Sequence, residues 1–323
     1  MLMKLPTLAD IESAAEIVYA NMPPTPQYRW PLLSERLGTE LWVKHENQTP
    51  VGAFKIRGGL VYFEHLARSG SLPDGAISAT RGNHGQSIAY AAGRHGVPVT
   101  IVVPRGNSRE KNAAMRALGA KLIEHGEDFQ ESLEYAIEQA RERSLHLVPS
   151  FHPLLIAGVA TYSLELFRAV PDLEVVYVPI GLGSGICGMI AARNALNLST
   201  RIVGVVSSHA VAYARSFEAG KLLESPVSTQ LADGMACRTP QPDALTIIRQ
   251  GAERIVEVSD AQVASSMRTL FECTHNVCEG AGAAALAAAM SERTALQGRK
   301  VSVVASGGNI DRSLFASVLS ENG

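Results

Sequence analysis

The chain has 323 residues, a length that suggests about two domains. Hydrophobic residues make up 46% and charged residues 19%, which is close to a typical globular protein and excludes intrinsic disorder. Lys and Arg together number 29 and Asp and Glu 31, so the formal net charge is −2. A near-neutral chain without a basic block has no electrostatic footprint for nucleic acid. We therefore expect no nucleic-acid partner and no membrane partner.

The N-terminal stretch contains one clear helix. Its apolar spacing predicts a helix over residues 7–21, followed by a Pro-rich stretch over 22–31 that must be extended or turning. Residues 40–44 form a short candidate strand. Residues 1–14 hold no apolar stretch long enough for a signal peptide. The four cysteines include no CxxC pair and no zinc-finger spacing, so we expect free thiols and a cytoplasmic protein.

Strand-like and helix-like segments alternate in the middle of the chain. Strands are predicted at 75–80, 97–104, 120–126 and 145–149, and helices at 84–96, 108–119 and 128–144. Such alternation is typical of a parallel sheet with right-handed crossovers.

A second run of the same kind follows. Strands are predicted at 174–180, 201–207 and 300–306, and helices at 155–170, 185–196, 259–274 and 280–291. The uncharged stretch 175–192 is not a membrane span, because proline and glycines interrupt it. The fold class is therefore α/β, with two open twisted sheets flanked by helices and a cleft between them.

Three Gly-rich turns follow predicted strands, at 80–85, 181–185 and 306–309. A fourth segment, 52–59, carries a lysine among small residues. Because ligands of open α/β sheets bind at the carboxyl ends of the strands, the three turns are expected to line one crevice. The turn at 181–185 opens a helix, and its free amides suit a phosphate.

A dinucleotide site is the alternative for this turn, since residues 183–188 match GxGxxG. That fingerprint needs an acid at the end of the next strand to bind the ribose. No Asp or Glu appears there before Glu218, so this alternative is disfavoured.

Five segments occur together and in a characteristic order: KHENQTPVGAFKIRGG, TRGNHGQS, VPIGLGSGICG, EGAGAAALAA and SGGNID. They resemble the fold-type II pyridoxal-phosphate enzymes, which are tryptophan synthase β-like, and most of all the threonine/serine dehydratase and serine racemase branch. The resemblance implies the cofactor pyridoxal 5'-phosphate, a small amino acid substrate and a homodimer. It also implies a large cofactor-binding domain, 1–74 plus 149–323, and a small domain, 75–148, that closes over the substrate.

The resemblance assigns the internal Schiff base with the cofactor to Lys55. Phe54 would border the cofactor, Asn83 would bind its 3-oxygen and Ser306 would face its pyridine nitrogen. The phosphate would be bound by Gly181, Leu182, Gly183, Ser184 and Gly185, and the substrate carboxylate by Thr80, Arg81, Gly82, Asn83 and His84.

The neutral side chain of Ser306 favours one outcome among the reactions of such enzymes. An acid at that place would stabilise a long-lived carbanion, whereas a serine favours prompt loss of a β-leaving group. Lys55, once released from the cofactor, is placed to act as the general base at Cα. We expect a dehydratase that converts a β-hydroxy amino acid such as L-threonine or L-serine to a 2-oxo acid and ammonia.

Three departures from the family pattern refine this expectation. The racemase branch has a serine where this chain has Arg81, and an arginine is always protonated, which disfavours racemisation. Val206 and Ala212 stand where related enzymes carry metal-binding acids, so no metal is expected. Ala53 stands where the family usually has a serine, and the family segment AGQGT appears here as AGVAT at residues 157–161. Both changes predict a less polar substrate pocket, which could accept a bulkier β-hydroxy amino acid.

Several alternatives stay open at this stage. A racemase or β-replacement enzyme of the same fold and a dinucleotide-dependent oxidoreductase are the competing functions. Arg81 either points to solvent or binds an anionic group. Four further residues are undecided between supporting and structural roles: Lys44, His45, Arg57 and Glu279. The chain as given ends soon after SGGNID, so no regulatory domain is expected beyond it.

Overall fold

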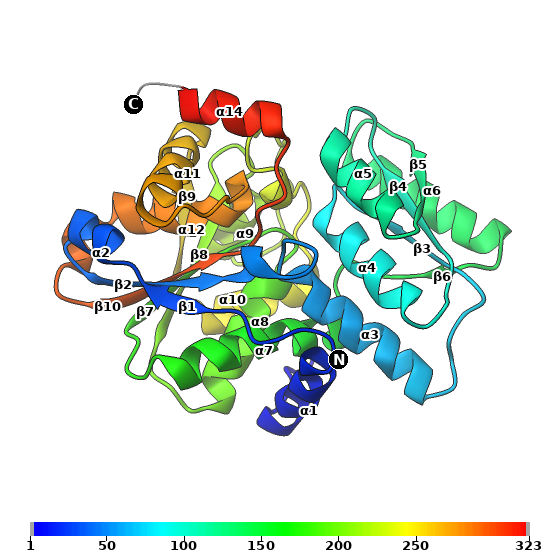
Figure 1. The fold of residues 1–323 in the computed structure, drawn as a ribbon, viewed down its shortest axis with the longest axis horizontal. Helices are drawn as coiled ribbons and strands as arrows, with labels where there is room; N and C mark the ends of the chain where they lie inside the picture. The colour runs from blue at the N-terminus through cyan, green and yellow to red at the C-terminus, as the bar shows by residue number, and fades with distance from the viewer. Residues whose placement is uncertain (1–2, 321–323) are drawn as a thin grey trace.

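The computed structural model describes residues 3–320 and contains two sheets with helices packed around them (Figure 1). The larger sheet has six strands in the order β1-β2-β10-β7-β8-β9. Only β1 runs antiparallel to its neighbour, β2, and the other pairs are parallel. The strands are β1 (Gln27–Arg29), β2 (Glu40–His45), β7 (Val175–Pro179), β8 (Arg201–Ser207), β9 (Arg254–Val258) and β10 (Lys300–Ala305).

The smaller sheet has four parallel strands in the order β5-β4-β3-β6. They are β3 (Ala76–Ala79), β4 (Val99–Val103), β5 (Lys121–Glu124) and β6 (His146–Leu147). All four lie in the region where the alternation of segments predicted a parallel sheet. The predicted fold class, α/β with two open sheets flanked by helices, is confirmed.

Helices cover both sheets. With the smaller sheet pack α4 (Asn83–Gly93), α5 (Arg109–Ala117) and α6 (Phe129–Glu142). Around the larger sheet lie α1 (Leu8–Tyr19), α2 (Pro31–Leu37), α7 (Pro153–Ala169), α8 (Ser184–Ala195), α9 (Ala212–Ala219), α10 (Pro242–Gly251), α11 (Asp260–Thr274), α12 (Gly280–Ser291), α13 (Arg293–Leu296) and α14 (Arg312–Ser320). Two short 3-10 turns are η1 (Glu46–Gln48) and η2 (Asp233–Met235).

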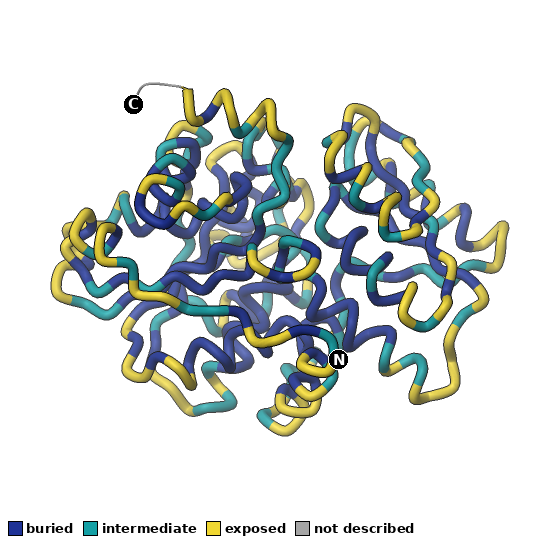
Figure 2. Tube along the Cα trace, viewed as in Figure 1, coloured by how far each residue is buried: buried dark blue, intermediate teal, exposed yellow. Residues whose placement is uncertain are grey.

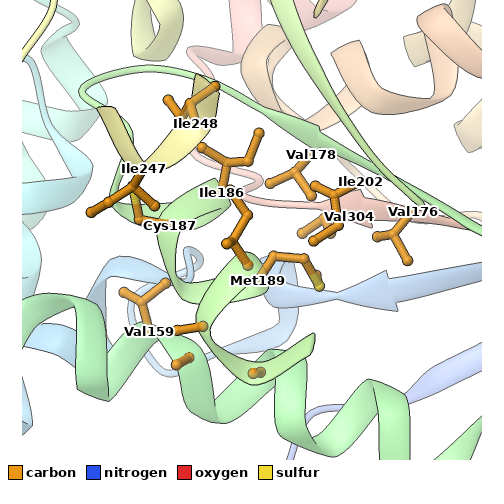
Figure 3. Close-up of a cluster of buried hydrophobic side chains, with 14 of the residues drawn as sticks. Val159, Val176, Val178, Ile186, Cys187, Met189, Ile202, Ile247, Ile248 and Val304 are labelled. Carbon is orange, nitrogen blue, oxygen red and sulfur yellow. The ribbon is translucent and has the colours of Figure 1, made fainter. Parts of the chain in front are cut away.

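The larger sheet is buried on both faces, as its near-continuous apolar strands require. Along β7, Val176 and Val178 point to one face and Val175 and Tyr177 to the other, following the two-residue period of a strand. Figure 3 shows the first of these clusters, where Ile186 and other side chains of α8 and α10 meet the strands. Helices α11 and α12 cover the opposite face. Figure 2 shows the resulting dark blue interior, with exposure concentrated on outer turns and helix flanks.

Helix α3 (Lys55–Arg68) lies between the two sheets, beside α4 in Figure 1. Its apolar residues share one core cluster with α4, β4 and α7. Gly59 makes this contact close, because a Cβ there would lie 2.4 Å from the Ser87 Oγ atom of α4. The helix therefore lies between the two sheets, and this packing fixes the position of its first residue, Lys55. The boundaries of the two domains stay a prediction.

Candidate active site

The Gly-rich turns at the ends of β3, β7 and β10 converge on one cavity of about 930 Å³ between the sheets. The start of α3 adds Phe54 and Lys55 to the wall. Every residue that the sequence singled out as a site residue lines this cavity: Phe54, Lys55, Thr80, Arg81, Gly82, Asn83, His84, Gly181, Leu182, Gly183, Ser184, Gly185 and Ser306. The crevice expected from the strand-end turns is therefore present.

Lys55 is the first residue of α3, and it is half-buried in the wall of the cavity. Its Nζ atom donates a hydrogen bond to Ser184 Oγ at 3.1 Å and lies 5.1 Å from the centre of the Phe54 ring. Among residues 3–320 it forms no ion pair with a carboxylate. Burial lowers the pKa of this amine to about 8. The amine is therefore far more available as a nucleophile than an ordinary surface lysine.

The turn 181–185 leads from β7 into α8 and leaves the first amides of the helix without intrahelical partners. Gly183 is the N-cap in the left-handed conformation, with φ +100°, and a Cβ there would lie 2.7 Å from the Ala244 side chain. Tyr213 supports the turn, since its hydroxyl donates to the Leu182 carbonyl at 2.9 Å. The first turn of α8 carries no acidic residue. Geometry and charge thus suit an anion.

Asn83 and Ser306 are held by hydrogen bonds on the cavity wall. Asn83 Nδ2 donates to Glu279 Oε1 at 2.5 Å, and Asn83 Oδ1 accepts from Asn309 Nδ2 at 2.9 Å. One hydrogen of the Asn83 amide is then left for a ligand. Ser306 Oγ donates to the Ala281 carbonyl at 3.4 Å, and the Ser306 carbonyl accepts from the Phe54 amide at 3.1 Å. The last bond places Ser306 beside the start of α3.

The turn 80–84 leads from β3 into α4. Thr80 Oγ1 accepts from the amides of Gly82 and Gly85, at 2.9 and 3.3 Å, and so fixes the turn. Burial, together with the nearby Lys55 charge, lowers the pKa of His84 to about 3, so this ring is neutral. Arg81 is half-buried and lines the cavity.

A buried ion cluster in the wall was not found from the sequence. Lys111 of α5 lies 2.7 Å from an oxygen of Asp233 and 2.9 Å from an oxygen of Glu279. Burial alone would lower the pKa of Lys111, but the charges of Glu279 and Asp233 raise it. Glu279 contacts Lys111 with one carboxylate oxygen and Asn83 with the other, so it links these two residues. In the sequence Lys111 looks like a solvated residue of an amphipathic helix, and no signal there points to this contact.

The other undecided residues lie behind the cavity. Arg57 Nε binds Glu46 Oε2 at 2.7 Å, and its Nη1 binds Glu165 Oε1 at 2.6 Å. Lys44 Nζ binds the second Glu165 oxygen at 2.5 Å. These four charges are buried, balance one another and fix α3 against β2 and α7.

His45 is also structural. Burial lowers its pKa to about 4, and its Nε2 accepts a hydrogen bond from Trp30 Nε1 at 2.9 Å. None of Lys44, His45 and Arg57 lines the cavity, whereas Glu279 does.

The expectation that Ala53 and residues 157–161 make the substrate pocket less polar is wrong. Neither Ala53 nor the segment 157–161 lines the cavity. Ala53 is fully buried and bridges to Gly307, while Thr161 accepts a hydrogen bond from Arg57. These positions belong to the core beneath the site, where close helix packing selects small residues.

Val206 is buried in β8 and Ala212 begins α9, so neither offers an oxygen ligand. Within residues 3–320, no group of three or more His, Cys, Asp or Glu side chains gathers as a metal site. The four cysteines are buried and free. Across the same residues no helix is both long and apolar enough to span a membrane.

The fold and the cavity define an enzyme of the α/β class with a reactive lysine. Residues 19–307 match the family described as pyridoxal-phosphate dependent enzyme, and the chain belongs to this family. L-threonine ammonia-lyase of Geobacter sulfurreducens is 38% identical over 280 residues, which cover 86% of this chain and 69% of that protein.

Two solved structures have the same fold. The processed form of threonine deaminase isoform 2 from Solanum lycopersicum matches with a TM-score of 0.89 and 28% identity, over 98% of this chain and 90% of that one. Maize serine racemase matches with a TM-score of 0.89 and 26% identity, over 97% of each chain.

Pyridoxal phosphate is the cofactor of the family, and the cavity fits it. To bind the aldehyde of the cofactor covalently, a lysine must be in its neutral form. Burial favours this form at Lys55 because it lowers the pKa of the amine. A phosphate needs free amides without a nearby acid, which the turn 181–185 provides. The family match therefore favours a pyridoxal-phosphate site over the dinucleotide site that GxGxxG suggested.

Proposed function

We propose that the chain is a pyridoxal-phosphate-dependent ammonia-lyase that acts on a β-hydroxy amino acid such as L-threonine or L-serine. The observation that carries the proposal is the amine of Lys55, which has no carboxylate partner among the described residues and lines the same cavity as the neutral Ser306. The names of the relatives, threonine ammonia-lyase and threonine deaminase, support the same reaction. One substrate gives one 2-oxo acid and one ammonia, because the water lost in elimination is returned in hydrolysis.

Each residue has a proposed task in binding the cofactor. Lys55 Nζ would hold the cofactor covalently, and the amides of the turn 181–185 would bind its phosphate. Asn83 has one free amide hydrogen for the 3-oxygen, while Glu279 and Asn309 keep that amide in place. Phe54 would border the cofactor, and Ser306 would accept or donate one hydrogen bond at the ring nitrogen.

When bound, the cofactor supplies an electron sink for the electron pair that remains at Cα after the proton is removed. Lys55 Nζ would remove the Cα proton, because its low pKa leaves it partly neutral near pH 7 and its place at the start of α3 would hold it beside the cofactor. Ser306 carries no negative charge and would not favour a protonated ring, which would favour loss of the β-hydroxyl over transamination. The open amides at the start of α4 would receive the substrate carboxylate.

Racemisation needs a proton donor on the face opposite Lys55, and Arg81 at that turn is unable to exchange a proton. Serine incubated with the holoenzyme in heavy water tests this point. We expect pyruvate and ammonia to form, with negligible formation of the opposite enantiomer. If the opposite enantiomer appears as fast as pyruvate, the chain is a racemase and the proposal is wrong.

We further propose a cytoplasmic homodimer. The four free buried thiols are consistent with a reducing compartment. Sedimentation of the purified holoenzyme tests the dimer, since a monomer at micromolar concentration contradicts it.

A further inference from the structure

Most of the charged side chains that line the cavity form ion pairs. Each of its four acids has a basic partner: Glu127 pairs with Arg105 at 2.6 Å, Asp128 with Arg238 at 2.9 Å, and Asp233 and Glu279 with Lys111 at 2.7 and 2.9 Å. Of the cavity cations, Lys111 and Arg238 are thereby neutralised. Lys55 is taken by the cofactor under the proposed function. Arg81 is the cation that remains.

Arg81 has no ion pair and no hydrogen bond within residues 3–320. Its Nε atom is fully buried without a partner, although the residue as a whole is only half-buried. A buried donor that binds nothing costs free energy, and a charged donor costs more. The guanidinium is also a planar fork that binds carboxylates through two parallel hydrogen bonds. The buried Nε and the planar guanidinium therefore offer a binding position for an anion.

Two of the anions expected in the cavity have other binding groups. The cofactor phosphate has the turn 181–185, which leads into α8 on the larger sheet. The substrate α-carboxylate has the amides of Asn83 and His84 at the start of α4, because Thr80 Oγ1 engages those of Gly82 and Gly85. Neither anion requires Arg81.

We propose that Arg81 forms a subsite for a second carboxylate, so that the preferred substrate is a dicarboxylic β-hydroxy amino acid. This inference rests on the proposed function and specifies its substrate class. The hydroxyl leaves from Cβ as before, the amine leaves as ammonia, and the product is a 2-oxo dicarboxylic acid.

The competing reading is an apolar substrate. Part of the cavity wall consists of half-buried apolar residues, among them Phe129 and Leu133 of α6 and Leu147 of β6. They would favour a large hydrocarbon substituent at Cβ. That reading gives the buried Nε of Arg81 no partner, so the second carboxylate is preferred, and the two readings predict opposite selectivity.

Binding of unreactive acids to the holoenzyme separates these cases. Succinate and butyrate each have four carbons, lack an amine and differ in one carboxylate. Calorimetric titration should show succinate binding about tenfold more tightly or better, as expected for one charge-assisted contact. In Arg81→Met this preference should vanish, while Arg81→Lys should keep part of it because the charge remains. Arg238→Gln is the matched control, since Arg238 lines the cavity but is already paired, and should keep the preference.

Three results would overturn the inference. The first is equal binding of succinate and butyrate by the wild-type holoenzyme. The second is an equal loss of both ligands in Arg81→Met, which would place Arg81 at the α-carboxylate. The third is tighter binding of 4-phenylbutyrate than of succinate, which would favour the apolar wall. The visible spectrum and thermal unfolding of each variant confirm that it is folded and holds the cofactor.

Turnover gives an independent reading. 3-Hydroxyaspartate should exceed L-threonine in kcat/KM for the wild type, and Arg81→Met should reverse that order. If the wild type turns over L-threonine but not 3-hydroxyaspartate, the subsite is wrong and the ammonia-lyase function stands. If neither substrate nor L-serine yields a 2-oxo acid, the proposed function itself fails.

Discussion

The titration of Lys55 can be measured through the rate at which the apoenzyme captures its cofactor. Burial lowers the pKa of this amine from the usual 10.5 to about 8. Only the neutral amine attacks an aldehyde. At pH 7 a pKa of 8 leaves about one tenth of the amine neutral, against about three parts in ten thousand for 10.5. The buried lysine thus gains about 300-fold in its reactive form relative to a solvated one.

The assay adds pyridoxal phosphate to cofactor-free enzyme between about pH 6 and about pH 10 and follows the visible absorbance of the lysine–cofactor imine. We expect the rate to rise about tenfold per pH unit and to level off above about pH 8. N-acetyl-lysine amide, treated in the same way, corrects for titration of the cofactor and should keep rising up to about pH 10. A protein rate that follows this reference over the whole range would refute the low pKa.

Three further predictions concern the reaction, the metal and the core. Ser306→Asp should slow elimination several-fold and increase exchange of the Cα proton in heavy water, because an acid at the ring nitrogen prolongs the carbanion; an unchanged ratio would show that Ser306 does not face the ring nitrogen. Excess EDTA should leave turnover unchanged, and a large loss restored by Mg²⁺ would contradict the reading of Val206 and Ala212. Glu165→Ala should lower the free energy of unfolding in urea by about 3–5 kcal/mol, because it leaves Lys44 buried without a carboxylate partner and Arg57 with Glu46 alone. Glu12→Ala, which removes an exposed ion pair with Arg168, is the control and should have little effect.

Much of the fold follows from local patterns in the sequence. The strands of the smaller sheet and β7, β8 and β10 were predicted because short apolar runs are bounded by turns and alternate with helical segments. Helix α3 was not predicted. Its first turns contain Gly58 and Gly59, which have low helix propensity. These glycines allow close packing between helices, since a Cβ at either would lie within 3 Å of α7 or α4.

Other elements were missed for related reasons. Helix α10 and strand β9 were not predicted, although Pro242 and Gly251 mark the two ends of α10. Both pack against the larger sheet, α10 on α8 and β9 beside β8. Helix α2 begins at Pro31, which terminates the Pro-rich stretch that was read only as extended or turning.

The site likewise contains residues that local motifs predict and contacts that they do not. Motifs that follow strands lead to the cavity because the carboxyl ends of parallel strands meet at one edge. The contact of Lys111 with Asp233 and Glu279 joins positions more than a hundred residues apart, and no local pattern indicates it. The error over Ala53 and residues 157–161 has the same origin, since sequence spacing does not distinguish a cavity wall from the core behind it.

The claim that Lys55 carries the cofactor is tested most directly by borohydride reduction of the holoenzyme followed by peptide mass spectrometry. Reduction converts the lysine–cofactor imine to a stable amine, so the modified residue can be identified. We expect the added mass on the peptide that contains Lys55, loss of the visible absorbance, and neither signal in Lys55→Ala. Lys111→Met serves as the control for a second buried lysine in the same cavity and should keep the modification on Lys55. Modification of another lysine in the wild-type enzyme, or an unchanged absorbance in Lys55→Ala, would contradict the assignment.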